Sequence, residues 1–253
     1  MPYIQGDGVR LYYEDHGRGP AVLLTHGYTA TLRMWDPQVE ELANNYRLIG
    51  WDMRGHGESD SPADPSAYSH DATVADMAAV LDACGVQRAV VGGLSLGGFM
   101  SLVFYLAFPE RVDALMLFDT GPGYKKEPAR AEWNRLAEDY AQRFETHGLA
   151  ALGSGREVKI ARHHSALGLA LAARGMLAQR DARVIEALTS IAVPTLLIAG
   201  SEDKPFLASI DYMAAKIPRA TKIIIDGAGH APNLERPEAF NQAVTTFLER
   251  LRA

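Results

Sequence analysis

The stretch Gly93–Gly97 constrains the fold of this chain more than any other part of the sequence. It reads Gly-Leu-Ser-Leu-Gly and fits the pattern G-x-S-x-G, in which a serine occupies a sharp turn between a strand and a helix. A short apolar run, Ala-Val-Val, precedes it at 89–91, and an apolar, helix-compatible stretch follows at 99–108, before Pro109. The flanking sequence therefore predicts the strand, the turn and the helix that the pattern requires.

The two glycines of this turn have a steric explanation. A serine held in a strained backbone conformation brings its neighbours so close that a Cβ atom at Gly93 or Gly97 would clash. The turn lifts the Ser95 hydroxyl above the sheet and points the Leu96 N–H and the helix N-terminus toward the same space, where developing negative charge is stabilised. On the pentapeptide alone, a glycine-rich turn that only packs tightly is nearly as good an explanation. Residues elsewhere in the chain must decide.

Strand-like and helix-like runs alternate on both sides of the serine turn. Expected strands lie at 9–14, 21–25, 47–51, 89–91, 112–118, 194–199 and 221–225. Expected helices lie at 36–43, 70–84, 99–108, 206–216 and 237–251. This alternation predicts an α/β fold with a mostly parallel sheet covered by helices on both faces. Functional side chains are then expected at the carboxyl ends of the strands.

The alternation stops between Gly121 and Ile191. Helix-like runs occupy 130–147, 156–164, 167–179 and 183–188, and no strand-like run interrupts them. We therefore expect a core domain at 1–120 and 192–253, and a helical cap at 121–191 that is an insertion rather than an independent domain. A cap over the carboxyl end of the sheet can select a substrate and exclude water.

Composition and charge argue against several classes of function. The chain has 253 residues, 47% of them hydrophobic, which suffices for one main domain. Acidic residues outnumber basic ones by 31 to 25 without a long basic run, so neither nucleic acid nor a membrane is an expected partner. The single cysteine, Cys84, cannot form an internal disulfide, and the N-terminus lacks the pattern of a signal peptide. We expect a cytoplasmic location.

Two groups of polar residues could be taken for a metal or cofactor site, but neither has the residues that such a site needs. The loop 52–60 is rich in glycine and polar residues, but it lacks the G-K-[ST] ending of a phosphate loop, and besides carboxylates it offers only His56 as a strong metal ligand. The neighbours His163 and His164 would point about 100° apart on a helix, so they cannot share a ligand face. We expect no metal and no organic cofactor.

Three residues with complementary chemistry, Ser95, Asp203 and His230, each lie just past an expected strand. Their order along the chain is that of nucleophile, acid and base in an α/β-hydrolase triad. With these residues the chain resembles the α/β-hydrolase superfamily over nearly its full length. The matching segments are His-Gly-Tyr at 26–28, Asp-Met-Arg-Gly-His-Gly at 52–57, the serine turn, Gly-Ser-Glu-Asp at 200–203 and Gly-His at 229–230.

The resemblance implies the α/β-hydrolase fold, with the helical cap inserted after the sixth strand, and a serine-hydrolase mechanism. Ser95 would attack the substrate, His230 would accept and return the proton, and Asp203 would orient His230. The resemblance also implies an oxyanion hole formed by the backbone N–H groups of Tyr28 and Leu96. Asp119 also follows a strand, and some α/β-hydrolases carry their acid there, so it remains the alternative to Asp203.

Within the superfamily, Gly17–Asp60 and the serine turn most resemble 3-oxoadipate enol-lactonases and small carboxylesterases. The resemblance implies a small-molecule ester or lactone as substrate. The serine argues against dehalogenase and epoxide-hydrolase chemistry, because the related families that perform it have an aspartate at this position. The sequence leaves the natural substrate, the cap's mobility and the oligomeric state open.

Two alternatives to an esterase or lactonase remain. Carbon–carbon hydrolases of aromatic-ring degradation usually have a glycine-rich loop with asparagine after His-Gly and a tryptophan after the catalytic histidine. Here those places hold Thr-Ala-Thr at 29–31 and Ala-Pro at 231–232. The other alternative is a receptor of the same fold that binds a small hydrophobic signal with little turnover. The expected walls of an apolar substrate pocket are Tyr28, Leu96, Phe206, Tyr124, Trp133 and Tyr140.

Overall fold

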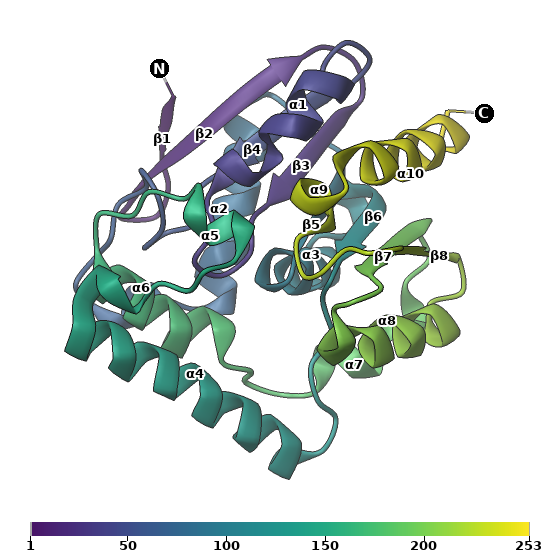
Figure 1. Ribbon diagram of the computed structural model, residues 1–253. Coiled ribbons are helices and arrows are strands. Elements are labelled where there is room, and N and C mark those ends of the chain that lie inside the picture. Colours follow the sequence, from purple (N-terminus) through teal and green to yellow (C-terminus); the bar gives the residue numbers. More distant parts are fainter. Residues whose placement is uncertain (1, 253) are drawn as a thin grey trace.

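An eight-stranded sheet forms the centre of the molecule, which is described here by a computed structural model covering residues 2–252 (Figure 1). The strand order is β1-β2-β4-β3-β5-β6-β7-β8. The strands are β1 (Tyr3–Gln5), β2 (Arg10–Gly17), β3 (Ala21–Thr25), β4 (Arg47–Trp51), β5 (Ala89–Leu94), β6 (Val112–Phe118), β7 (Thr195–Gly200) and β8 (Ala220–Ile225). The pairs β1–β2 and β2–β4 are antiparallel, and the other neighbours are parallel. The expected mostly parallel sheet is confirmed.

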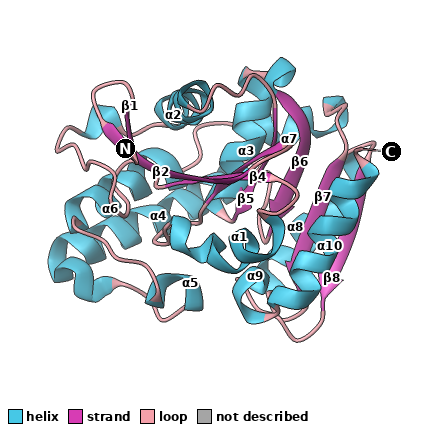
Figure 2. Ribbon diagram, turned by 90° about the horizontal axis from the view of Figure 1, so that it is seen from above, coloured by secondary structure: helices cyan, strands magenta, loops and turns pink. Residues whose placement is uncertain are grey.

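Helices cover both faces of this sheet (Figure 2). The helices of the core are α1 (Asp36–Leu42), α2 (His70–Ala83), α3 (Leu96–Ala107), α8 (Lys204–Lys216), α9 (Pro232–Glu235) and α10 (Pro237–Arg250). Buried residues of α2, α3 and α8 pack on one face, and those of α1 and α10 pack on the other. Adjacent strand residues alternate between the two faces, as Leu23 and Leu24 do in β3. Because both faces are covered, all six residues of β5 are buried.

The described residues between β6 and β7 form only helices and their connections. These helices are α4 (Glu127–His147), α5 (Arg156–Lys159), α6 (Ala166–Ala172) and α7 (Arg183–Ala187). Figure 1 shows α4 and α6 together, away from α1 and α10. Helix α5 lies by α9 of the core, where Arg156 donates to Leu234 O over 3.3 Å. A π-helical turn, Ala173–Leu177, follows α6, and its last hydrogen bond runs from Ala178 N–H to Ala173 O over 3.0 Å.

Two of these helices differ from the sequence expectation. The helix expected at 156–164 ends at Lys159, because His163 is used as a side-chain bridge to backbone groups of the core. The helix expected at 167–179 changes to the π turn after Ala172. Within residues 2–252, no helix is long and apolar enough to cross a membrane.

The inserted helices share their packing with the core. Leu171, Met176 and Leu177 belong to the same buried cluster as residues of α2 and α3. A smaller cluster lies between α4 and α6, around Phe144 and Leu169, and the partly buried Tyr28 of the core packs against it. The burial of apolar surface is therefore continuous from the sheet into the inserted helices.

Candidate active site

Ser95 sits in a strained turn between β5 and α3. Its φ and ψ are 54° and −115°, a combination that a residue other than glycine rarely adopts. A Cβ atom on Gly93 or on Gly97 would overlap the backbone oxygen of Thr25 in the neighbouring strand. These close approaches agree with the steric reason for both glycines that the sequence suggested.

Two backbone N–H groups near this serine are free to donate. Leu96 is the first residue of α3, so its N–H has no partner within the helix. Tyr28 lies in the loop after β3, and within residues 2–252 neither its N–H nor that of Leu96 forms a hydrogen bond. The next residue, Thr29, has a positive φ of 62°, which marks a tight bend in this loop. Both groups remain available for an oxyanion.

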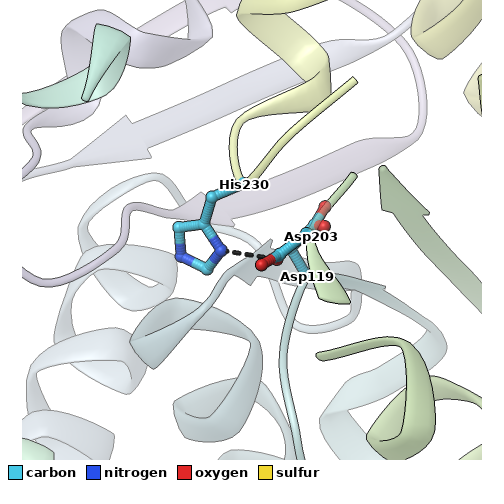
Figure 3. Close-up of side chains that lie close together, drawn as sticks. All are labelled: Asp119, Asp203 and His230. Atoms are coloured by element: carbon cyan, nitrogen blue, oxygen red, sulfur yellow. Dashed lines mark hydrogen bonds and ion pairs between the residues drawn. The ribbon is translucent and has the colours of Figure 1, made fainter. Parts of the chain in front are cut away.

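His230 and Asp203 form a hydrogen-bonded pair at the carboxyl end of the sheet (Figure 3). His230 Nδ1 donates to Asp203 Oδ2 over 2.7 Å, with the Asp203 side chain 7% exposed and that of His230 34% exposed. The ring of Phe206 lies against the imidazole, with 5.1 Å between the ring centroids. The pair leaves Nε2 of His230 as the nitrogen that can exchange a proton with a substrate.

Within residues 2–252, Ser95 and His230 form no direct hydrogen bond. Phe206, which contacts His230, lines the same cavity as Ser95. Catalytic hydrogen bonds are often long in a ligand-free enzyme and tighten when substrate binds. The hydrogen bond between Ser95 and His230 therefore stays a prediction for the complex.

Asp119 lies beside the pair but is bonded differently. It is completely buried, has a φ of 41°, and accepts the Gly200 N–H through Oδ1 over 2.9 Å. Its other oxygen, Oδ2, is buried without a partner in the described part of the chain. Burial raises the pKa of Asp119 to about 9, and the neighbouring carboxylate of Asp203 adds to this shift. Asp119 thus holds a proton at neutral pH, while Asp203 is the carboxylate that bonds to His230.

These three side chains also place potential metal ligands close together. One oxygen of each carboxyl group and a ring nitrogen of His230 lie within 4.8 Å of one another. Nδ1 of His230 already donates its proton to Asp203, and the proton on Asp119 reduces the negative charge that a cation would find. The donor set is better explained by the hydrogen-bonded pair and its neutral neighbour than by a cation site.

The protonated state of Asp119 predicts how stability depends on pH. Because the pKa of Asp119 is higher in the folded than in the unfolded chain, its contribution to stability is full below about pH 4 and is lost as pH rises toward 9. Asp119→Asn removes this titration and keeps an oxygen for the Gly200 N–H. We expect the free energy of unfolding of the variant to rise relative to wild type by up to about 1 kcal/mol per pH unit. Urea titrations between pH 5 and 9 measure this, and parallel pH profiles would contradict it.

A cavity of about 120 Å³ opens beside Ser95. Its walls are formed by Ser95, Leu96, Phe99, Thr120, Gly121, Gly123, Tyr124, Trp133, Leu177, Gln179, Pro205, Phe206 and Ser209. Four of the six expected wall residues are among them. The other two, Tyr28 and Tyr140, pack their rings against each other at 5.9 Å, and the Tyr28 hydroxyl donates to Leu169 O over 2.8 Å. The Tyr28 ring thus packs against the inserted helices and is not part of the described cavity wall.

Several polar residues at or near the site carry no motif and were missed from sequence. Thr120 donates its hydroxyl to Ser95 O over 2.6 Å, and Gln179 lines the cavity from the inserted segment. His70 is buried and bonds to the carbonyl oxygens of Met176 and Ala178. Contacts between residues far apart in the sequence create all three environments, with the serine turn for Thr120 and with the inserted segment for Gln179 and His70, so no local signal predicts them.

His163 joins the inserted segment to the loops around the site. Its Nδ1 accepts the Gly57 N–H over 3.1 Å, and its Nε2 donates to Thr29 O over 2.9 Å. Burial lowers the pKa of His163, which agrees with the neutral ring that these two bonds require. The loop 52–60 is a hydrogen-bonded turn, since Asp52 accepts the N–H groups of Leu32 and Glu58.

Fold and site together define a class of protein. A mostly parallel sheet, a strained serine before a helix, and a histidine–aspartate pair beyond later strands are the features of an α/β hydrolase. A family model described as "alpha/beta hydrolase fold" matches residues 20–183. The chain therefore belongs to the alpha/beta hydrolase family, and it is a hydrolase.

Known proteins similar to this chain over nearly its whole length carry different names. A Bacillus subtilis protein provisionally named 2-succinyl-6-hydroxy-2,4-cyclohexadiene-1-carboxylate synthase is 30% identical, with 96% of each chain covered. 3-oxoadipate enol-lactonase 2 of Acinetobacter baylyi is also 30% identical, with 96% of this chain and 94% of the relative covered. The structure of a thermophilic esterase from Thermogutta terrifontis is similar with a TM-score of 0.85 and 28% identity, covering 97% of this chain and 95% of the esterase.

Proposed function

We propose that this hydrolase cleaves short, uncharged carboxylic esters or lactones, with Ser95 as a covalent nucleophile. The observation that carries the proposal is the strained Ser95 in the wall of a cavity, close to a partly buried histidine–aspartate pair. The enol-lactonase and esterase names of similar proteins support the reaction class. Relatives with the same sequence identity carry different enzyme names, so these names do not identify the substrate. The residues that line the cavity are the better guide to it.

The proposed reaction begins with attack by Ser95. Its Oγ forms a bond to the carbonyl carbon of the substrate while Nε2 of His230 takes the hydroxyl proton. The N–H groups of Leu96 and Tyr28 donate to the negatively charged oxygen of the tetrahedral intermediate. Asp203 holds Nδ1–H of His230, so that the ring presents the correct nitrogen and its positive charge is stabilised.

The second half of the reaction releases the products. His230 gives its proton to the departing alkoxide oxygen, the carbon–oxygen bond breaks, and an acyl group remains on Ser95. A water molecule then attacks this acyl group with His230 as base. Collapse of the second intermediate frees the carboxylic acid and restores the Ser95 hydroxyl. For a lactone, both products are parts of one hydroxy acid.

We also propose that residues 1–120 and 192–253 form the catalytic core and that residues 121–191 act as a cap rather than an independent domain. The support is that Tyr124, Trp133 and Leu177 cover the cavity while the same segment shares buried packing with the core. We infer that the partner is a small molecule, and that the protein is cytoplasmic, since its single cysteine has no possible disulfide partner within the chain.

The cavity limits both the size and the charge of the group it accepts. Its volume of about 120 Å³ is smaller than the ~150 Å³ of an engineered apolar cavity that binds benzene. None of the described residues that line it is charged. A carboxylate buried there would lose hydration without gaining a cation, so short uncharged acyl groups fit the walls best.

Relative rates on charged and uncharged substrates test this proposal. We expect kcat/KM for p-nitrophenyl acetate, p-nitrophenyl butyrate or a small neutral lactone to exceed that for a 2-hydroxy-6-oxo-dienoate by at least about tenfold, since only the dienoate brings a carboxylate to this wall. A preference for the dienoate would favour the carbon–carbon hydrolases. Tight binding of small apolar molecules with no turnover of any substrate would favour a receptor.

A further inference from the structure

One amide in the cavity wall is held in place but has unused hydrogen-bond donors. Gln179 is 8% exposed, lines the cavity beside Ser95, and accepts the Tyr124 N–H through its side-chain Oε1 over 3.0 Å. Since a backbone N–H can only donate, this bond identifies the amide oxygen. Within residues 2–252, Nε2 of Gln179 has no hydrogen-bond partner.

The position of this amide is determined from three sides. The Asn134 side chain of α4 bonds to both backbone groups of Gln179, accepting its N–H over 2.7 Å and donating to its oxygen over 2.9 Å. Gly123 has a φ of +84°, and a Cβ atom there would lie 2.8 Å from Oε1. A larger residue at position 123 would push the amide away. The neighbouring residues thus hold the Gln179 amide in a largely apolar wall. A polar group in an apolar wall is the arrangement that sets the orientation of ligands in small-molecule sites.

Most other polar groups of the wall are already engaged. The Trp133 indole N–H donates to Leu177 O over 2.9 Å, and the Thr120 hydroxyl donates to Ser95 O. Apart from the proposed nucleophile, the hydroxyl groups of Ser209 and Tyr124 and the Gln179 amide remain among the described wall residues. A hydroxyl can rotate and can donate or accept, whereas the bound Oε1 leaves Gln179 with donors only.

We propose that Gln179 is a specificity-determining residue that donates a hydrogen bond to a second, uncharged acceptor oxygen on the acyl part of the substrate. This inference rests on the proposed ester or lactone hydrolysis and narrows its substrate class to acyl groups with a ketone, ether or amide oxygen beyond the scissile carbonyl. An apolar acyl chain would cover the Gln179 amide and leave it unpaired, which costs free energy. An acceptor oxygen on the acyl group supplies the partner that such a chain lacks.

Matched pairs of esters test this role. The pairs are p-nitrophenyl 4-oxopentanoate against pentanoate, and 5-oxohexanoate against hexanoate, in which a ketone replaces a methylene group. The quantity to compare is the ratio of kcat/KM within a pair, in wild type and in each variant, because the intrinsic reactivity of the two esters then cancels. For Gln179→Met we expect the keto preference to fall about tenfold in at least one pair, as the keto ester loses its donor and the alkyl ester no longer covers an unpaired amide.

Two further variants keep the result interpretable. Gln179→Glu keeps an oxygen for the Tyr124 N–H and removes the donors, so it should also lose the keto preference. Ser209→Ala removes one of the other available hydroxyl groups of the wall and should change the ratio less than about twofold. Equal ratios in wild type, Gln179→Met and Gln179→Glu would overturn the role of Gln179, although ester hydrolysis itself would stand. If wild type cleaves none of the four esters, the proposed function fails instead.

Discussion

Replacing Ser95 with alanine is expected to lower kcat for p-nitrophenyl butyrate by about 10⁶-fold, the loss that removal of the nucleophile causes in a Ser-His-Asp hydrolase. The reason is that the acyl-enzyme can no longer form, while the oxyanion donors and the cavity remain. Alanine at this position has to adopt the same strained φ of 54°. We expect it to do so because the surrounding glycines and strands already impose this turn. Steady-state kinetics on the folded variant, checked by circular dichroism, provide the measurement.

A covalent probe gives the same prediction an independent readout. A fluorophosphonate should modify wild type at Ser95, and peptide mass spectrometry should find the adduct there. Ser101→Ala is the matched control, since that hydroxyl lies on α3, the helix that follows Ser95, and donates to Gly97 O over 2.8 Å. The control should label normally. An adduct on another serine, or activity that survives in Ser95→Ala, would remove Ser95 from the mechanism.

Asp203→Asn is expected to lower kcat by about 10⁴-fold. An amide at this position can present its NH₂ group to Nδ1 of His230, which favours the wrong tautomer, and it cannot stabilise the imidazolium that forms during the reaction. The comparison that decides the acid is Asp119→Asn, measured in the same assay. Because Asp119 already carries a proton and bonds to Gly200 rather than to His230, its amide variant should lose no more than about tenfold.

The reverse ranking of these two variants would move the acid to Asp119. Comparable large losses in both would mean that the two carboxyl groups act as one unit with a shared proton. Folding controls matter here because both side chains are buried, so each variant should be compared by its urea midpoint before its kinetics are interpreted.

The serine turn could be predicted from sequence because its cause is local. Gly93, Ser95 and Gly97 lie within five residues. Their spacing identifies the turn, and the two glycines stand where a Cβ atom would overlap neighbouring backbone. The alternation of buried strands with helices could be predicted for the same reason, since the apolar residues of each element show the pattern of a strand or of a helix. Strand β1, with three residues, and helix α9, with four, are too short to show a period, and both were missed.

The choice between Asp119 and Asp203 depends on distances that sequence does not contain. Both residues follow parallel strands, so both arrive at the same edge of the sheet. Only the path of the loop after β7 brings Asp203 to Nδ1 of His230, while Asp119 turns back to the backbone of Gly200. The place of the Tyr28 ring could not be predicted for the same reason, because it depends on a hydrogen bond to Leu169 O in the inserted helices.

The bridge formed by His163 has a consequence for protein engineering. Its two ring nitrogens bond to Gly57 N–H and Thr29 O, and Thr29 directly follows the proposed oxyanion donor Tyr28. A chimera that receives a foreign cap without an imidazole at this place would leave both backbone groups unpaired and would loosen the loop that carries Tyr28. Grafted caps should therefore be screened for retention of this histidine as well as for a new pocket, because exchanging the cap alone would change turnover and selectivity at the same time.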